Sequence, residues 1–211
     1  MTKTIYVVVH PEATHHVVGL VGGWYDSNLT VQGLTDAKAI AQWLRREIPT
    51  ELSIDIFSSD SQRARRTADQ IGDALQAVVT PDRRLREKSY GAAEGRHQSW
   101  LDERFIPPPT TGDRLNHDEG IPGAETKAVF AARVYSAMED VIARTTEWQV
   151  IVTHGFALTF VIAAWIQMPL MSVGYANFRS KPGSITTLHL DDFFHNRQVA
   201  VLADTRHLDQ T

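Results

Sequence analysis

The chain has 211 residues, of which 43% are hydrophobic and 22% are charged. This length and balance favour a single globular domain over residues 1–211 and exclude a disordered chain. The absence of cysteine excludes disulfides, thiolate nucleophiles and cysteine-bound metal centres. The net charge of −4 is spread without long runs of one sign, so we expect no nucleic-acid partner.

The hydrophobic stretches are all too short to cross a membrane. The amino-terminal run MTKTIYVVVH lacks the length and the small-residue cleavage site of a signal peptide. No stretch reaches the roughly 20 apolar residues of a transmembrane helix. We therefore expect a cytoplasmic protein with no membrane partner.

Two strand–helix units are predicted early in the chain. Residues 5–9 are a continuous β-branched and aromatic run, typical of a buried parallel strand, and the run ends at His10. A helical pattern then begins at Thr30, the expected N-cap. The second unit comprises a strand, two capping residues and a helix, at residues 54–58, Ser59 and Asp60, and residues 62–75.

A long irregular segment follows, with three consecutive prolines at residues 107–109. Irregular segments of this length are usually functional in compact domains, so we expect a lid-like insertion at about residues 88–123. The remaining elements are a helix, a strand, an apolar helix and two strands, at residues 125–144, 149–153, 157–167, 184–190 and 197–202. This alternation predicts an α/β fold, with a mostly parallel sheet covered by helices on both faces.

Two predicted strands end in histidine, at His10 and His154. Ligands bind outside the carboxyl ends of strands in such sheets, so both imidazoles are expected to face one pocket. Arg63 lies at the start of a helix, where free backbone N–H groups and a guanidinium together suit a phosphate group. The neighbouring Arg65 and Arg66 are expected on a solvated helix face.

Histidines can also bind metals. No pair has the spacing of a metal site on a helix, and we expect neither a metal nor a cofactor. The histidines considered are His10, His15, His16, His97, His117 and His154.

Five ordered segments resemble the phosphoglycerate mutase-like histidine phosphatases. They are VVVHPEATHH, GGWYDSNLTVQG, SSDSQRARRT, LREKSYGAAEG and VTHG, and they span most of the chain. The resemblance implies a three-layer α/β sandwich and phosphoryl transfer through a phosphohistidine. The GGWYD segment and the three prolines are most similar to the mutase branch.

The resemblance also implies roles for individual residues. His10 matches the nucleophile, Arg63 the phosphate clamp, His154 the second pocket histidine and Glu87 the proton donor, with Glu94 as the alternative acid. A general acid must be protonated, so we expect burial to raise the pKa of Glu87. Further substrate or phosphate contacts are expected at His16, Gly23, Tyr90 and Gly155.

The chain departs from the family at the nucleophile. The family's Arg-His-Gly triplet is Val9-His10-Pro11 here, so one core arginine is absent, and His16 stands where the family has asparagine. One charge-assisted donor can be worth several kcal/mol in such a site. We expect that His15 or His16, if protonated over a bound dianion, replaces part of the lost charge.

Three functions fit these residues. A phosphomonoesterase acting on a small phosphorylated metabolite is the first. A phosphoglycerate mutase-like phosphotransferase is favoured by GGWYD, although Arg104 and Arg114 are isolated in the predicted lid. A non-catalytic phosphate-binding protein would suit the loss of the arginine at Val9, but such a protein would have no use for Glu87.

The predicted lid also bears on the substrate. Residues 99–123 contain few cations but include Trp100 and Phe105, which favours a partly apolar leaving group over a polyphosphate. A homodimer is compatible with the sequence, which assigns no surface to it.

Overall fold

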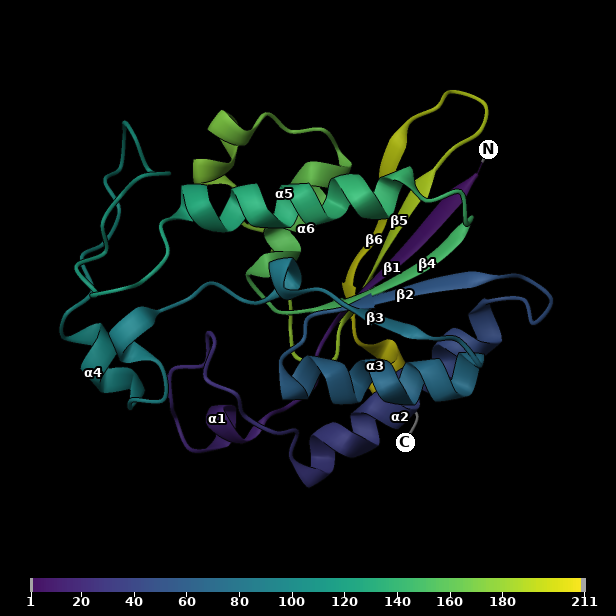
Figure 1. Ribbon diagram of the computed structural model, residues 1–211, viewed down its shortest axis with the longest axis horizontal. Coiled ribbons are helices and arrows are strands. Elements are labelled where there is room, and N and C mark those ends of the chain that lie inside the picture. Colours follow the sequence, from purple (N-terminus) through teal and green to yellow (C-terminus); the bar gives the residue numbers. More distant parts are fainter. Residues whose placement is uncertain (1, 210–211) are drawn as a thin grey trace.

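The computed structural model describes residues 2–209 and is built around one six-stranded sheet (Figure 1). The strand order is β3-β2-β4-β1-β5-β6. Strands β1 to β4 run parallel, whereas β5 is antiparallel to both of its neighbours. The bounds are β1 Lys3–Val9, β2 Ile54–Ser58, β3 Val79–Pro81, β4 Trp148–Thr153, β5 Ile185–Leu190 and β6 Arg197–Asp204.

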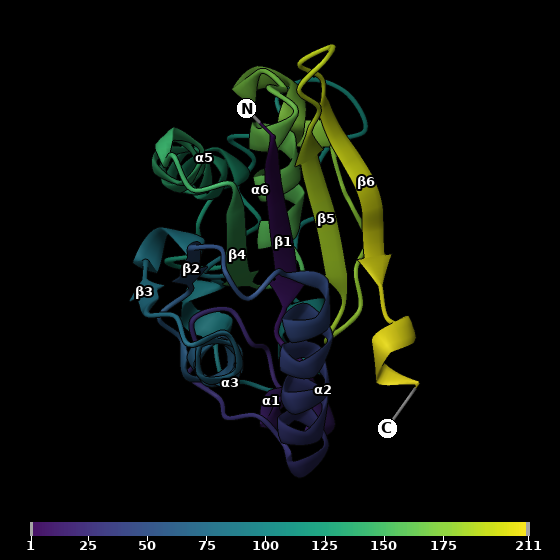
Figure 2. The ribbon, with the colours of Figure 1, turned by 90° about the vertical axis from the view of Figure 1, so that its right-hand side faces the viewer.

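Helices cover both faces of the sheet, which confirms the predicted three-layer architecture (Figures 1 and 2). One face carries α2 (Val31–Glu47) and α3 (Gln62–Leu75), and the other carries α5 (Lys127–Ala143) and α6 (Ala157–Trp165). Short helices lie at α1 Thr14–Val17 and α4 Gln98–Asp102, with 3-10 helices at Arg83–Leu85, Gly91–Ala93, Leu170–Tyr175 and Arg206–Leu208. Within residues 2–209, no helix is long and apolar enough to cross a membrane.

The central strand β1 explains the two cores. Ile5, Val7 and Val9 pack against α5 and α6, whereas Tyr6 and Val8 pack against α2 and α3. Successive side chains of a strand point to opposite faces, so a strand buried on both sides must be continuously apolar. The unbroken apolar run before His10 is therefore a consequence of the layered fold.

The helix start that leads to the site differs from the prediction in one detail. The N-cap of α3 is Ser61, and not Ser59 or Asp60. Ser59 instead hydrogen-bonds to His154, and Asp60 forms an ion pair with Arg86. The two predicted capping residues thus bond to side chains outside α3 and do not cap the helix.

The segment after β3 is largely irregular, as expected, but α4 and the 3-10 helices within it were not predicted. A small separate core of Val21, Ala93, Leu101 and Ile121 packs this segment together. The two ends of the segment are joined by Lys88, which is 1% exposed and donates to Glu119 Oε2 at 2.6 Å. This ion pair ties the far end of the segment to the edge of the active site.

Candidate active site

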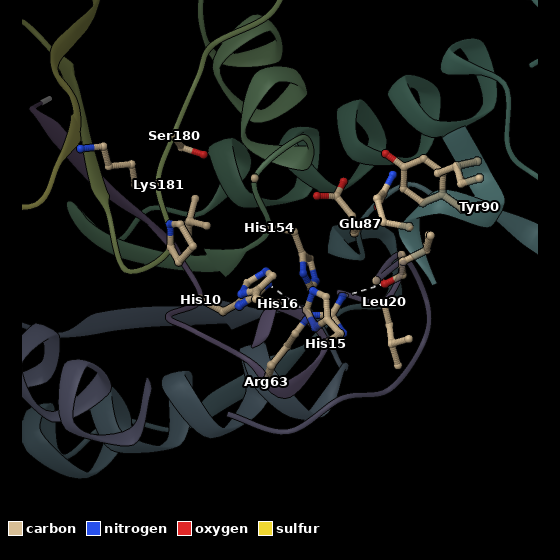
Figure 3. Close-up of a pocket in the computed structure, with 18 residues that line it drawn as sticks. His10, His15, His16, Leu20, Arg63, Glu87, Tyr90, His154, Ser180 and Lys181 are labelled. Carbon is tan, nitrogen blue, oxygen red and sulfur yellow. Dashed lines mark hydrogen bonds between the residues drawn. The ribbon is translucent and has the colours of Figure 1, made fainter. Parts of the chain in front are cut away.

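A cavity of about 360 Å³ lies at the carboxyl ends of β1 and β4 (Figure 3). The parallel register pairs the last residues of these strands, and His10 N–H donates to Thr153 O at 3.1 Å. This arrangement brings the rings of His10 and His154 within 5.0 Å of each other, between centroids. All predicted site residues line the cavity: His10, His16, Gly23, Arg63, Glu87, Tyr90, His154 and Gly155.

The hydrogen bonds of His10 determine which ring nitrogen is free to react. Its Nδ1 lies 2.8 Å from the carbonyl oxygen of Pro11, which can only accept, so Nδ1 carries the proton. Burial, followed by the charge of Arg63, holds the pKa of His10 well below its usual range. His10 is therefore a neutral imidazole with its lone pair on Nε2, the form required of a nucleophile.

Arg63 is held directly beside this lone pair. Its Nε donates to His10 Nε2 at 3.1 Å, and its two terminal nitrogens donate to the carbonyl oxygens of Tyr25 and Gly23 at 2.8 and 2.7 Å. The side chain is 1% exposed, so the guanidinium has little freedom to move. The guanidinium is thus a preoriented cation beside His10, and its role as a phosphate clamp stays a prediction.

His154 has one satisfied and one unsatisfied nitrogen. Its Nε2 lies 2.8 Å from Ser59 Oγ and 3.4 Å from Ser61 Oγ. Its Nδ1 is buried and has no hydrogen-bond partner within residues 2–209. A buried polar atom without a partner costs about 1–3 kcal/mol, so this nitrogen is well suited to contact a bound ligand.

The two candidate acids lie in different surroundings. Glu87 lines the cavity between His154 and Tyr90 (Figure 3), and burial raises its pKa against the opposing effect of backbone N–H groups of Phe156 and Lys88. Glu94 lies outside the lining, where it accepts hydrogen bonds from Ser89 Oγ and the Tyr90 N–H. The geometry therefore favours Glu87 as the proton donor.

Two residues that sequence reasoning missed hold the backbone of Glu87. Trp24 Nε1 and Arg133 Nη2 both donate to the Glu87 carbonyl oxygen, at 2.8 and 2.7 Å. Arg133 also donates to the carbonyl oxygens of Arg84 and Arg86. Trp24 belongs to the GGWYD segment, so the resemblance pointed to this position without assigning it a role.

His15 and His16 are neutral in the free site, and their protonation over a bound dianion stays a prediction. Burial lowers the pKa of His15 to about 3, and burial and Arg63 lower the pKa of His16. His16 also accepts a hydrogen bond at Nδ1 from the Ala13 N–H, at 3.2 Å, so its proton is on Nε2. His16 is thus a neutral hydrogen-bond donor at the cavity, as an asparagine would be.

At the position of the missing arginine the cavity is lined by the apolar side chain of Val9, and Lys181 lines it from another loop. Val9 is 3% exposed and belongs to the core that α5 and α6 cover. Lys181, which sequence reasoning did not identify, lines the cavity from the loop before β5, and its amino group points away from His10 (Figure 3). Among the described lining residues, Arg63 is thus the one permanent cation beside His10.

The described part of the chain contains no group of three or more histidine, aspartate or glutamate side chains placed to hold a metal ion. His97 and His117 do not line the cavity and hydrogen-bond to Ser99 Oγ and the Ile106 carbonyl oxygen. These two histidines therefore have local structural partners.

Comparison with known proteins identifies the family of the chain. The protein named "Putative phosphoserine phosphatase 2" of Hydrogenobacter thermophilus is 29% identical over 192 residues, which cover 90% of each chain. "Probable phosphoglycerate mutase GpmB" of Yersinia pestis is 29% identical over 171 residues, which cover 78% of this chain and 75% of the relative. The solved structure of Bacillus stearothermophilus YhfR is 27% identical, covers 98% of this chain and 99% of its own, and has a TM-score of 0.77. Because the family model of the histidine phosphatase superfamily (branch 1) matches residues 5–203, the chain belongs to that superfamily.

Proposed function

We propose that the protein hydrolyses a small phosphomonoester through a phosphohistidine on His10. The observation that carries this proposal is the geometry of the nucleophile, whose unprotonated Nε2 lies 3.1 Å from Arg63 Nε at the base of the cavity. The phosphatase name of a relative that covers 90% of the chain supports the reaction class.

In the first step, Nε2 of His10 attacks phosphorus and the bond from phosphorus to the alcohol oxygen breaks. Arg63 exchanges its hydrogen bond to Nε2 for the phosphoryl oxygens, whose charge it stabilises. The carboxylic acid of Glu87 transfers its proton to the departing oxygen, so the alcohol leaves neutral. His10 then carries the phosphoryl group on Nε2 and keeps its Nδ1 proton on the Pro11 carbonyl oxygen.

In the second step, water attacks the phosphohistidine and the bond between nitrogen and phosphorus breaks. The carboxylate of Glu87, formed in the first step, removes a proton from the water. Inorganic phosphate is released, and the neutral imidazole and protonated acid are restored. The raised pKa of Glu87 suits both roles, because it brings the acid nearer to the pH at which the enzyme works.

Phosphoryl transfer to a second hydroxyl is the alternative, and the likeness to GpmB favours it. Both reactions share the first step and differ in the acceptor. Incubation with a phosphomonoester panel, with measurement of inorganic phosphate and of isomerised ester, separates them. We expect phosphate release in wild type and none in His10→Ala. Isomerised ester without free phosphate would identify a mutase. If no ester gave either product, the protein would be a non-catalytic phosphate-binding protein.

A further inference from the structure

The catalytic cavity offers one fixed positive charge to a bound phosphate ester. Such an ester carries about two negative charges near neutral pH. Arg63 is the one permanent cation beside His10 among the described lining residues, and the histidines of the cavity are neutral in the free site. A charge taken out of water is costly unless it is paired. Part of the charge of a bound ester therefore has no cation opposite it while the histidines stay neutral.

A second permanent cation, Lys181, is among the described residues that line this cavity. Its side chain is exposed and forms no ion pair within residues 2–209. In the free site the amino group points away from His10 (Figure 3). A lysine ammonium is a point charge on a flexible stem, so it can turn toward a ligand without any change in the backbone.

A tight turn fixes the backbone from which this side chain extends. The Ser184 N–H donates to the Lys181 carbonyl oxygen at 3.1 Å, which closes a turn of four residues. Pro182 is its second residue, and Gly183, with a φ of +77°, is its third. Proline followed by a glycine with positive φ is typical of a type II turn, and the proline ring restricts φ. The Cα of Lys181 is therefore held in place while its side chain is free.

The same turn is bonded to the strand that carries the nucleophile. The Gly183 N–H lies 3.1 and 3.2 Å from the carbonyl oxygens of Val9 and His10. The Val9 N–H in turn donates to the Ser184 carbonyl oxygen at 3.0 Å. The turn therefore holds Lys181 next to the position where the family's arginine is replaced by valine.

We propose that Lys181 turns into the cavity when a phosphate ester binds and donates to the phosphoryl oxygens, where it supplies the charge that Val9 cannot. The proposal rests on phosphoryl binding at His10 and adds a phosphate-binding residue to that site. Arg63 of α3 and Lys181 of the turn before β5 then oppose the dianion from two different elements. Protonation of His15 or His16 is the alternative source of the missing charge.

Calorimetric binding of vanadate and of inorganic phosphate tests the proposal without turnover. We expect Lys181→Met, which keeps an unbranched side chain but loses the charge, to weaken both anions about 10-fold. This estimate is the value of a hydrogen bond to a charged group, reduced by the cost of ordering a lysine side chain. Lys181→Arg should restore most of the lost affinity, because it restores the charge. Lys181 is exposed, so both variants should fold normally.

Lys38→Met is the matched control, because Lys38 is an exposed lysine of α2 that does not line the cavity. It should bind both anions as wild type does. The pH dependence separates lysine from histidine as the source of charge. Lysine stays charged on both sides of the usual histidine pKa of about 6.5. The ratio of affinities between wild type and Lys181→Met should therefore stay constant across that range.

Unchanged affinity in Lys181→Met would overturn the proposal, and so would an equal loss in Lys38→Met. A loss in Lys181→Met that is confined to low pH would also overturn it, because a titrating histidine would then be the source of the charge. Failure of the proposed hydrolysis gives a different result. In that case wild type does not turn over p-nitrophenyl phosphate, while calorimetry still reports whether Lys181 contacts the bound anion. Wild type that binds neither anion would overturn both proposals.

Discussion

At the scale of single residues, His16 is a neutral side chain in the free site, at the position where the family has asparagine. The Ala13 N–H donates to its Nδ1, so a proton on Nδ1 would face the Ala13 N–H and the hydrogen bond would be lost. Burial and Arg63 also lower its pKa. A neutral imidazole that donates from Nε2 provides the same hydrogen bond as an asparagine amide.

We therefore predict that His16→Asn keeps vanadate affinity near that of wild type, whereas His16→Phe, which has no donor, weakens it about 10-fold. The measurement is the vanadate inhibition constant of each protein across the pH range around the usual histidine pKa of about 6.5. If wild type instead binds vanadate more tightly than His16→Asn only at low pH, His16 acts through charge and the neutral-donor account is wrong.

Glu87 gives a prediction about leaving groups. Glu87→Gln should slow alkyl phosphates by about 100- to 10,000-fold and p-nitrophenyl phosphate far less, because nitrophenolate leaves without a proton. The raised pKa of Glu87 means that the acid persists above its usual range. The rate on alkyl phosphates should therefore fall as pH rises through that raised pKa, and this fall should be absent in Glu87→Gln.

Glu94→Gln is the matched control for this prediction. Its carboxylate accepts from Ser89 and Tyr90 outside the cavity, so it should affect both substrates equally. Steady-state kinetics on both substrates decides the question. A selective loss on alkyl phosphates in Glu94→Gln would transfer the acid role to that residue.

At the scale of elements, one helix holds the segment that carries the acid. Arg133 of α5 forms a two-point ion pair with Glu125 and donates to the carbonyl oxygens of Arg84, Arg86 and Glu87. Arg133 does not line the cavity, so it acts as a positioning residue.

We predict that Arg133→Met lowers kcat on alkyl phosphates more than it weakens vanadate binding, because the acid loses its position while the phosphate clamp remains. It should also destabilise the fold by about 3–5 kcal/mol, as breaking a largely buried ion pair does. Urea denaturation and kinetics on the same protein test both parts. Equal losses of kcat and vanadate affinity would mean that Arg133 supports the whole site rather than Glu87.

The same scale shows which elements were predictable from sequence. Residues 5–9 form a continuous apolar run that is buried on both faces, residues 62–75 bury one face of a helix, and both elements appear as expected. The short α4 has only Leu101 buried, so it lacks the pattern that identifies a helix. The N-cap of α3 was misassigned because Ser59 and Ser61 are chemically equivalent in sequence. In the structure Ser61 is the N-cap, and Ser59 Oγ is the nearer of the two to His154 Nε2, at 2.8 Å against 3.4 Å.

At the scale of the whole molecule, the two cores position the catalytic edge. Phe130 of α5 is fully buried, and its ring packs 5.4 Å from Phe156 and 4.9 Å from Phe160, between centroids. Phe156 also donates its backbone N–H to Glu87 Oε2. The core under α5 and α6 therefore positions Phe156, whose backbone N–H holds the Glu87 carboxyl group.

We predict that Phe130→Ala lowers the free energy of unfolding by about 3–5 kcal/mol, the cost of removing a buried aromatic ring. Val31→Ala, at a side chain that is 85% exposed, is the control and should change it by less than about 0.5 kcal/mol. Chemical denaturation measures both values. A small effect at Phe130 would indicate that the aromatic cluster is not tightly packed.

The site as a whole was only partly predictable. His10, Arg63 and His154 were singled out because each lies at the end of a strand or the start of a helix, whereas Glu87 was assigned from the family resemblance alone. A second cavity, whose lining includes Lys127 and Arg179, gave no local signal, because these residues meet there only after folding. Sequence therefore pointed to residues of the first cavity, whereas the lining of the second follows only from the three-dimensional structure.

We expect His10 to carry the phosphoryl group during turnover. Rapid quench of the enzyme with a radiolabelled phosphomonoester, followed by mapping of the labelled peptide, detects such an intermediate. An acid-labile label should form on His10 before phosphate is released, and it should be absent in His10→Ala. Phosphate release at the normal rate with no label on His10, or equal turnover by His10→Ala, would contradict it.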